Sequence, residues 1–284
     1  MFSATKGRNV AGIIPLAGYQ NNLGSPLPDY LQLISSEYTA LERSVYECCF
    51  AGCDSIWIVC NDDVSPVVRS LIGDYVMNPK IYKTWNKLKN HEEHKEYIPV
   101  FYVPVLRKHR NRRDSLGWSI LDGSLTAYKI SKSITKWSTP SKYYVSFPCS
   151  IYNPEAVFPF RAKIRGPESF YLSHENQTVK DGKYLGFTFS PEDWRVYKKF
   201  IRENCTGGSK DLHPKERWSS RNFSVDKIFN RDTISIDIKI ELDSCFDMNS
   251  WNRLIEYYRS DSKLMKPHKD IIKPYRKKDC YETK

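Results

Sequence analysis

The first half of the chain alternates short apolar runs with segments of helical periodicity, the pattern of a parallel sheet built from strand–helix–strand units. Residues 10–18 form an apolar run that ends in glycine, which predicts a buried strand followed by a glycine turn. Residues 39–52 place their apolar side chains on one helical face and end in a glycine that predicts the helix stop. The run at 55–60 is apolar throughout and suits a strand covered on both faces. A second helix is expected at 65–75.

The same alternation continues as far as residue 150. We expect a third strand at 97–105, and its prolines place it at an edge of the sheet. A long helix is predicted at 116–134, followed by a fourth strand at 142–147. The polar residues 79–97 are predicted to form either a helix or an insertion. These elements together indicate one doubly wound unit.

The second half adds a smaller mixed part. Its predicted elements are strands at 169–172, 182–189 and 233–242, and helices at 190–204 and 249–258. Ser190 is the expected N-cap of its helix, and strict alternation at 233–242 predicts a half-exposed strand. The predicted fold is therefore an α/β, three-layer, Rossmann-like fold with a mainly parallel central sheet. We expect one domain over 1–262 and a basic C-terminal tail at 263–284.

Composition narrows the class of protein. With 40% hydrophobic and 27% charged residues, the sequence is that of a globular protein. No apolar stretch reaches the roughly 18 residues of a membrane span, and the first residues lack the apolar core of a signal peptide. The eight cysteines include no CxxC pair, so we expect reduced, buried thiols. These observations predict a cytoplasmic protein that is neither secreted nor bound to a membrane.

The net charge of +11 favours anionic partners. Residues 107–113 carry five positive charges within seven positions, and the tail after residue 263 is also basic. The expected ligand is a nucleoside triphosphate or another phosphorylated small molecule. An acidic protein or a nucleic acid is a second kind of partner for the basic loop and tail. The alternative is that the loop is a solvated surface and the tail a frayed terminus.

Ligands of doubly wound sheets bind beyond the carboxyl ends of the strands. The turn at 16–24 lies there, yet it contains neither G-x-G-x-x-G nor the P-loop pattern. The order of segments nevertheless resembles the nucleotidyltransferases of the nucleotide-diphospho-sugar transferase fold. The segments that carry the resemblance are Ile13-Ile-Pro-Leu-Ala-Gly18, Pro28-Asp-Tyr-Leu31, the helix ending at Gly52, the strand ending at Cys60, Gly117 with its helix, the strand ending at Cys149, and Asp247-Met-Asn-Ser-Trp-Asn-Arg-Leu254.

The resemblance implies transfer of a nucleotidyl group from a nucleoside triphosphate to a phosphorylated sugar or similar acceptor. It also implies nucleotide-binding residues and a magnesium ligand. The nucleotide-binding candidates are Leu16, Ala17, Gly18, Gly24 and Gly117. Asp247 is the candidate ligand of magnesium. Arg110, Arg112 and Arg113 of the basic loop are the candidate catalytic cations, since this loop precedes the Gly117 helix.

The sequence departs from the family at three charged positions. The arginine of the glycine turn is absent from residues 18–22, the lysine that follows is Asp29, and the metal-binding aspartate is Cys149. Nucleotidyl transfer needs cations and a metal, because positioning and charge neutralisation supply nearly all of its rate. Two hypotheses follow. In the first, other residues have rebuilt the site; the candidates are the basic loop and the carboxylates of Asp62, Asp63, Asp114 and Asp122. In the second, the chain is a catalytically degenerate structural or assembly protein, of a kind that a virus could encode.

Overall fold

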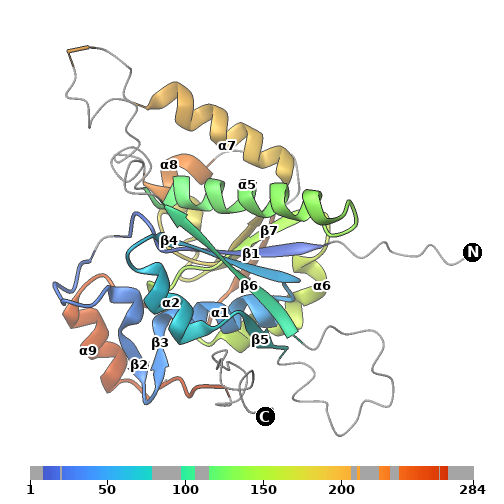
Figure 1. Ribbon diagram of the computed structural model, residues 1–284. Helices are drawn as coiled ribbons and strands as arrows, with labels where there is room; N and C mark the ends of the chain where they lie inside the picture. Colours follow the sequence, from blue (N-terminus) through green and yellow to red (C-terminus); the bar gives the residue numbers. More distant parts are fainter. Residues whose placement is uncertain are drawn as a thin grey trace, which may run out of the picture.

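The computed structural model describes residues 9–19, 21–78, 97–105, 115–205, 210–211, 224–230, 237–261 and 263–267. Their main element is a central sheet with the strand order β11-β9-β10-β7-β1-β4-β6-β5 (Figure 1). The bounds of these strands are β1 (Val10–Pro15), β4 (Ser55–Asn61), β5 (Tyr75–Met77), β6 (Tyr97–Val105), β7 (Lys142–Val145), β9 (Ser169–Ser173), β10 (Phe187–Phe189) and β11 (Asp237–Glu241). The four central strands, β7, β1, β4 and β6, are parallel, so their carboxyl ends meet at one edge. The predicted mainly parallel sheet is confirmed.

Helices cover both faces of this sheet, which confirms the three-layer architecture. Figure 1 shows α5, α7 and α8 on one face and α1, α2 and α6 on the other. Their bounds are α1 (Ala40–Ala51), α2 (Ser65–Ile72), α5 (Leu116–Ile134), α6 (Arg161–Ile164), α7 (Pro191–Asn204) and α8 (Val225–Phe229). Because successive strand residues point to opposite faces, β4 sends Ile56 and Ile58 into one apolar core and Trp57 and Val59 into the other.

Short elements complete the fold. They are η1 (Asp29–Leu31), the pair β2 (Leu33–Ser35) and β3 (Tyr38–Thr39), η2 (Pro154–Phe160), η3 (Val179–Asp181), the pair β8 (Ser150–Ile151) and β12 (Phe246–Asp247), and α9 (Trp251–Arg259). Lys266, within the predicted tail, forms an ion pair with Glu42 at 2.7 Å. The domain boundary at residue 262 stays a prediction. No helix in the described part of the chain is both long and apolar enough to cross a membrane.

Helix α1 differs from its predicted environment. A capping box between Thr39 and Glu42 starts it, and Gly52, at φ 87°, ends it as predicted. The expected apolar face is buried, but so is every other residue of the helix, including Arg43 and Glu47. The reason is that η1 and η2 pack on the side that an amphipathic helix would leave to solvent.

Three other expectations need correction. Strand β6 is not at the edge, because β5 pairs with its first three residues. The helix expected at 65–75 ends at Ile72, and β5 begins at Tyr75. The strand expected at 182–189 is only β10, since Gly182 ends η3 in the left-handed region and residues 182–186 are not in a strand. Helix α9 has Ser250 as its N-cap, close to the expected start at 249. The segment 79–96 lies outside the described residues.

Candidate functional site

The glycine turn follows β1 at the carboxyl edge of the sheet and is fixed to its neighbours. The backbone N–H groups of Leu16 and Ala17 both donate to the carbonyl oxygen of Val59, at 2.8 and 3.0 Å. The Ser119 hydroxyl of α5 donates to the carbonyl of Ala17 at 2.5 Å. Gly18 then reverses the chain at φ 83°, in the left-handed region that glycine tolerates best. The turn is therefore held to β4 and α5 at the place expected of a ligand-binding loop.

A buried carboxylate occupies two of the backbone donors of this turn. Asp29 is fully buried, and its Oδ2 accepts the N–H of Asn22 at 2.7 Å and that of Leu23 at 3.3 Å. The N–H of Asp29 donates in return to the side-chain oxygen of Asn21 at 3.3 Å. Backbone N–H groups of a glycine turn are the groups that would bind a phosphate, and here the protein's own anion accepts two of them. The replacement of the family's lysine by Asp29 thus has a structural role.

The same turn is closed from the side by α9 and by aromatic rings. The indole N–H of Trp251 donates to the carbonyl of Leu23 at 2.6 Å. Tyr19 packs edge-on against Tyr30, with ring centroids 6.1 Å apart. Burial raises the pKa of the Tyr19 hydroxyl, and the neighbouring Cys149 adds to this shift. A neutral phenol therefore lies between the turn and the end of β7.

Cys149 and Asp247 lie together beyond the end of β7. Strand β12 pairs with β8 so that Asp247 faces Ser150, and the N–H of Met248 donates to the carbonyl of Cys149 at 2.7 Å. Burial raises the pKa of the Cys149 thiol, although Arg43 acts in the opposite direction. The cysteine is therefore protonated and adds no charge where the family has a carboxylate.

The groups around Asp247 do not fit magnesium. Its Oδ2 lies 3.3 Å from the ammonium of Lys183, and its Oδ1 lies 3.5 Å from the Ser150 hydroxyl. Mg²⁺ is bound through carboxylates and other hard oxygens, and a cation already pairs with the one carboxylate present. Among the described residues, no group of three His, Cys, Asp or Glu side chains could hold a metal ion. We therefore assign no metal-dependent step to this arrangement.

A buried ion pair between Arg43 and Glu47 of α1 contacts the chain just after the end of β7. The Arg43 guanidinium contacts Glu47 at 2.9 Å, donates to the carbonyl of Phe147 at 2.5 Å and lies 4.3 Å from the ring centroid of Tyr152. Burial opposes the charge of Arg43, yet Tyr152 and Glu47 raise its pKa overall. Sequence analysis missed this pair, because an Arg–Glu pair four residues apart on a helix usually lies on the surface.

The predicted nucleotide-binding glycines have different surroundings. A Cβ on Gly117 would lie 2.1 Å from Cδ1 of Ile228, so α8 fills the space against this glycine. Gly24 is exposed, at φ 63°, and a Cβ added to it would meet no atom within 4 Å. Asp62 and Asp63 follow β4 at the same edge of the sheet.

The remaining candidates either lie outside the described residues or are buried. Arg110, Arg112, Arg113 and Asp114 lie outside the described residues, so their catalytic role stays a prediction. Leu16 and Ala17 are buried in the two cores. The described part of the site therefore has the ion-paired Asp247, the protonated Cys149 and a turn whose Asn22 and Leu23 amides are bound by Asp29.

No protein-family model matches the sequence, and no curated protein matches it by sequence. Solved structures do match the fold. A UDP-glucose pyrophosphorylase solved with UDP-glucose is 13% identical, over 88% of this chain and 97% of that one, with a TM-score of 0.53. A Bacillus anthracis protein described as a glucose-1-phosphate thymidylyltransferase is 11% identical, over 91% and 98%, with a TM-score of 0.54. Another UDP-glucose pyrophosphorylase, solved without ligand, is 15% identical, over 88% and 96%, with a TM-score of 0.52. The chain therefore has the nucleotide-diphospho-sugar transferase fold of the nucleotidyltransferases.

Proposed function

We propose that this chain is a catalytically degenerate relative of the nucleotidyltransferases, which has kept their fold and acts as a structural or assembly protein in the cytoplasm. The observation that carries the proposal is the buried Asp29 carboxylate bound to the amides of Asn22 and Leu23. A triphosphate at the turn would lose these two donors and would meet a negative charge. Either effect weakens binding, because anions bind where amides and cations point at them.

Two further features support the proposal. Ile228 packs against Gly117, on the helix where the family holds its nucleobase. Lys183 pairs with Asp247, and the protonated Cys149 replaces the second carboxylate. Nucleotidyl transfer depends on neutralising phosphate charge. A site whose carboxylate is paired with a lysine, and whose second carboxylate is replaced by a thiol, lacks the metal ligands that would supply most of the rate enhancement.

The test is thermal unfolding with UTP or dTTP and magnesium, together with an assay for released pyrophosphate in which a sugar 1-phosphate is added as the acceptor. We expect no shift of the melting temperature at millimolar ligand and no pyrophosphate. A nucleotide present at about 100 times its Kd would add about 2.7 kcal/mol, which is roughly 5–10 °C in a domain of this size. A shift of that size, with pyrophosphate release that Asp247→Asn abolishes, would refute the proposal.

The matched variant is Asp29→Asn. It removes the negative charge but keeps one side-chain oxygen for the amides of Asn22 and Leu23, so we expect it to bind no nucleotide either. A gain of nucleotide binding in this variant would show that charge repulsion alone, and not the occupied amides, excludes the ligand.

A second candidate function is nucleotidyl transfer by a rebuilt site, favoured by the position of Asp247 beside Cys149. In that case the basic loop would supply the missing cations. Replacing Arg110, Arg112 and Arg113 together by Ala would then abolish the nucleotide-dependent shift and pyrophosphate release. Under our proposal the wild-type protein shows neither signal, so the measurement on the wild-type protein alone distinguishes the two functions.

A further inference from the structure

Helix α7 presents a row of basic side chains on the surface opposite α1. Its capping box, between Ser190 and Asp193, fixes where the helix begins, and Tyr197 and Ile201 on its inner side are buried in the core. This orientation leaves the outer side to a set of positive residues spaced i, i+3, i+4 and i+7, which we call the α7 stripe. Its members are Arg195, Lys198, Lys199 and Arg202.

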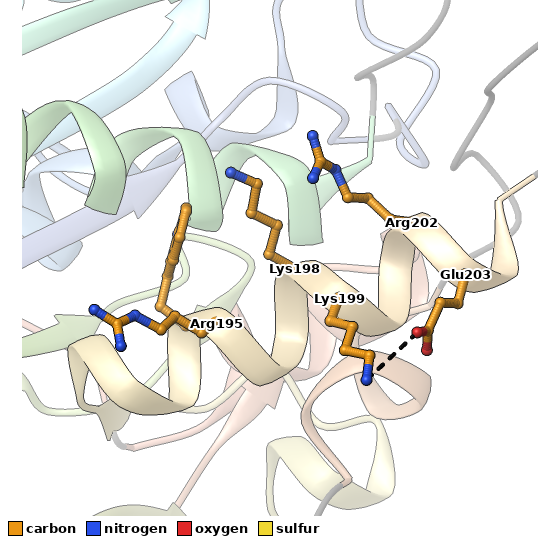
Figure 2. Close-up of a pocket in the computed structure, with 6 residues that line it drawn as sticks. Arg195, Lys198, Lys199, Arg202 and Glu203 are labelled. Carbon is orange, nitrogen blue, oxygen red and sulfur yellow. Dashed lines mark ion pairs between the residues drawn. The ribbon is translucent and has the colours of Figure 1, made fainter.

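The stripe lines a hollow of about 330 Å³ along the helix. Figure 2 shows Lys198 and Arg202 pointing from α7 toward α5. Trp194, also in the lining, donates its indole N–H to the carbonyl of Leu121 at 3.0 Å, which ties α7 to α5. The Lys198 ammonium lies 4.5 Å from the centroid of the Trp194 ring. The hollow is thus a fixed feature of the α5–α7 surface.

The charges in the hollow are not balanced within it. The single acidic residue in the lining, Glu203, pairs with Lys199 at a loose 3.7 Å (Figure 2). Arg195 and Arg202 have no ion-pair partner among the residues that the structure describes. Like charges three and four residues apart on a helix repel one another, so an anion in the hollow would relieve a cost that the free protein bears.

Two observations favour a nucleic acid as this anion. From Arg195 to Arg202 the helix rises by seven steps, about 10 Å along its axis, which corresponds to about three steps of a nucleic-acid strand at roughly 3.4 Å each. The ring of Trp194 is covered by Lys198, so the hollow lacks the open aromatic anchor typical of a protein–protein interface. Nucleic-acid interfaces are instead polar and strongly positive.

The segments that adjoin α5 and α7 in the sequence are basic as well. In Figure 1 the start of α5 and the end of α7 lie at the same end of the molecule. Residues 107–113, with their five positive charges, precede α5 in the sequence, and residues 205–223 follow α7. We propose that the α7 stripe binds the phosphate backbone of a nucleic acid without reading its bases. None of the residues that line the hollow belongs to the glycine turn.

The experiment is fluorescence anisotropy of a labelled DNA duplex of arbitrary sequence, titrated with the full chain over a series of salt concentrations and without nucleotide or magnesium. If three to four phosphates are neutralised, the logarithm of the affinity falls with the logarithm of salt at a slope of about −3. The variant carrying Arg195→Ser and Arg202→Ser should bring this slope to about −1.2 and weaken binding at least about tenfold near 0.1 M salt.

The matched control carries Arg253→Ser and Arg259→Ser on α9, which removes the same net charge from exposed positions elsewhere. This control should change the slope little, and the pair Arg195→Lys and Arg202→Lys should keep it, because backbone binding needs charge and not a particular side chain. Equal losses in the α7 and α9 variants, or no binding by the wild-type chain, would overturn the proposal. Displacement of the duplex by polyglutamate at equal charge concentration would overturn it in favour of an acidic protein. Circular dichroism confirms that each variant is folded, and Gln replaces Ser in any that is not.

Because no nucleotide or metal is present, this result is independent of the test of the proposed function. A protein that fails to bind UTP can still bind the duplex, and the reverse also holds.

Discussion

Replacing Glu47 by Gln removes the acceptor on which a buried polar network depends. The carboxylate of Glu47 accepts hydrogen bonds from the hydroxyls of Tyr144 at 2.5 Å, Ser146 at 2.5 Å and Tyr152 at 2.7 Å, and pairs with Arg43 at 2.9 Å. Glutamine offers one oxygen and turns an NH₂ toward groups that also donate. At least one donor then loses its partner, and the fully buried Arg43 loses its counter-charge.

The magnitude follows from that burial. Breaking a buried pair by removing one partner costs about 3–5 kcal/mol, because the remaining charge has no water to solvate it. For a domain of this size the loss corresponds to roughly 6–20 °C in melting temperature. The assay is urea denaturation followed by circular dichroism, with calorimetry for the melting temperature.

Glu203→Gln is the matched control. Glu203 is also the acidic partner of a helical i, i+4 pair, but its side chain is 59% exposed and its contact with Lys199 measures 3.7 Å. We expect it to change stability by no more than about 0.5 kcal/mol. A loss below about 1 kcal/mol for Glu47→Gln, or equal losses for both variants, would refute the reasoning that the buried network holds the end of β7.

Two further predictions concern packing and pH. Gly123→Ala should lower stability by about 1–3 kcal/mol in urea denaturation, since its Cβ would lie 2.6 Å from Val59 and 3.2 Å from Ile13; a gain of stability would mean that the helix propensity of alanine outweighs this crowding. Stability should fall as the pH rises from about 9 to 11, because burial raises the pKa of Cys60 to about 11 while the unfolded thiol ionises near its ordinary value of 9.0. The unfolded state then binds fewer protons, and each such thiol costs about 1.4 kcal/mol per pH unit in this window. Urea midpoints that stay constant between pH 8 and 10 would contradict this prediction.

The elements that could be predicted from the sequence are those with strong local signals. Helix α5 has its predicted bounds, because a serine cap precedes nineteen residues of helical periodicity. Strands β1 and β4 are apolar throughout and lie in the middle of the sheet, where both faces are covered. The resemblance to the nucleotidyltransferases also predicted the correct fold.

The features that could not be predicted depend on contacts between distant segments. Strands β8 and β12 are two residues long and exist because the chain near Asp247 returns to the end of β7. Asp29 can be recognised as a departure from the family pattern, but only the structure shows which amides its carboxylate binds. The α7 stripe has an ordinary amphipathic pattern in the sequence. Its grouping over one hollow becomes evident only when α7 is oriented by its buried tyrosine.

The complete burial of α1 has a consequence for how this chain can change. Helix α1 and the helix that carries the stripe lie on opposite faces of the sheet and belong to different apolar cores. Substitutions at well-separated sites affect stability almost independently. The outward side of α7 can therefore accumulate new charges and acquire new partners without disturbing α1, where every position is constrained by its neighbours. Substitutions can therefore accumulate faster on the outward side of α7 than in α1.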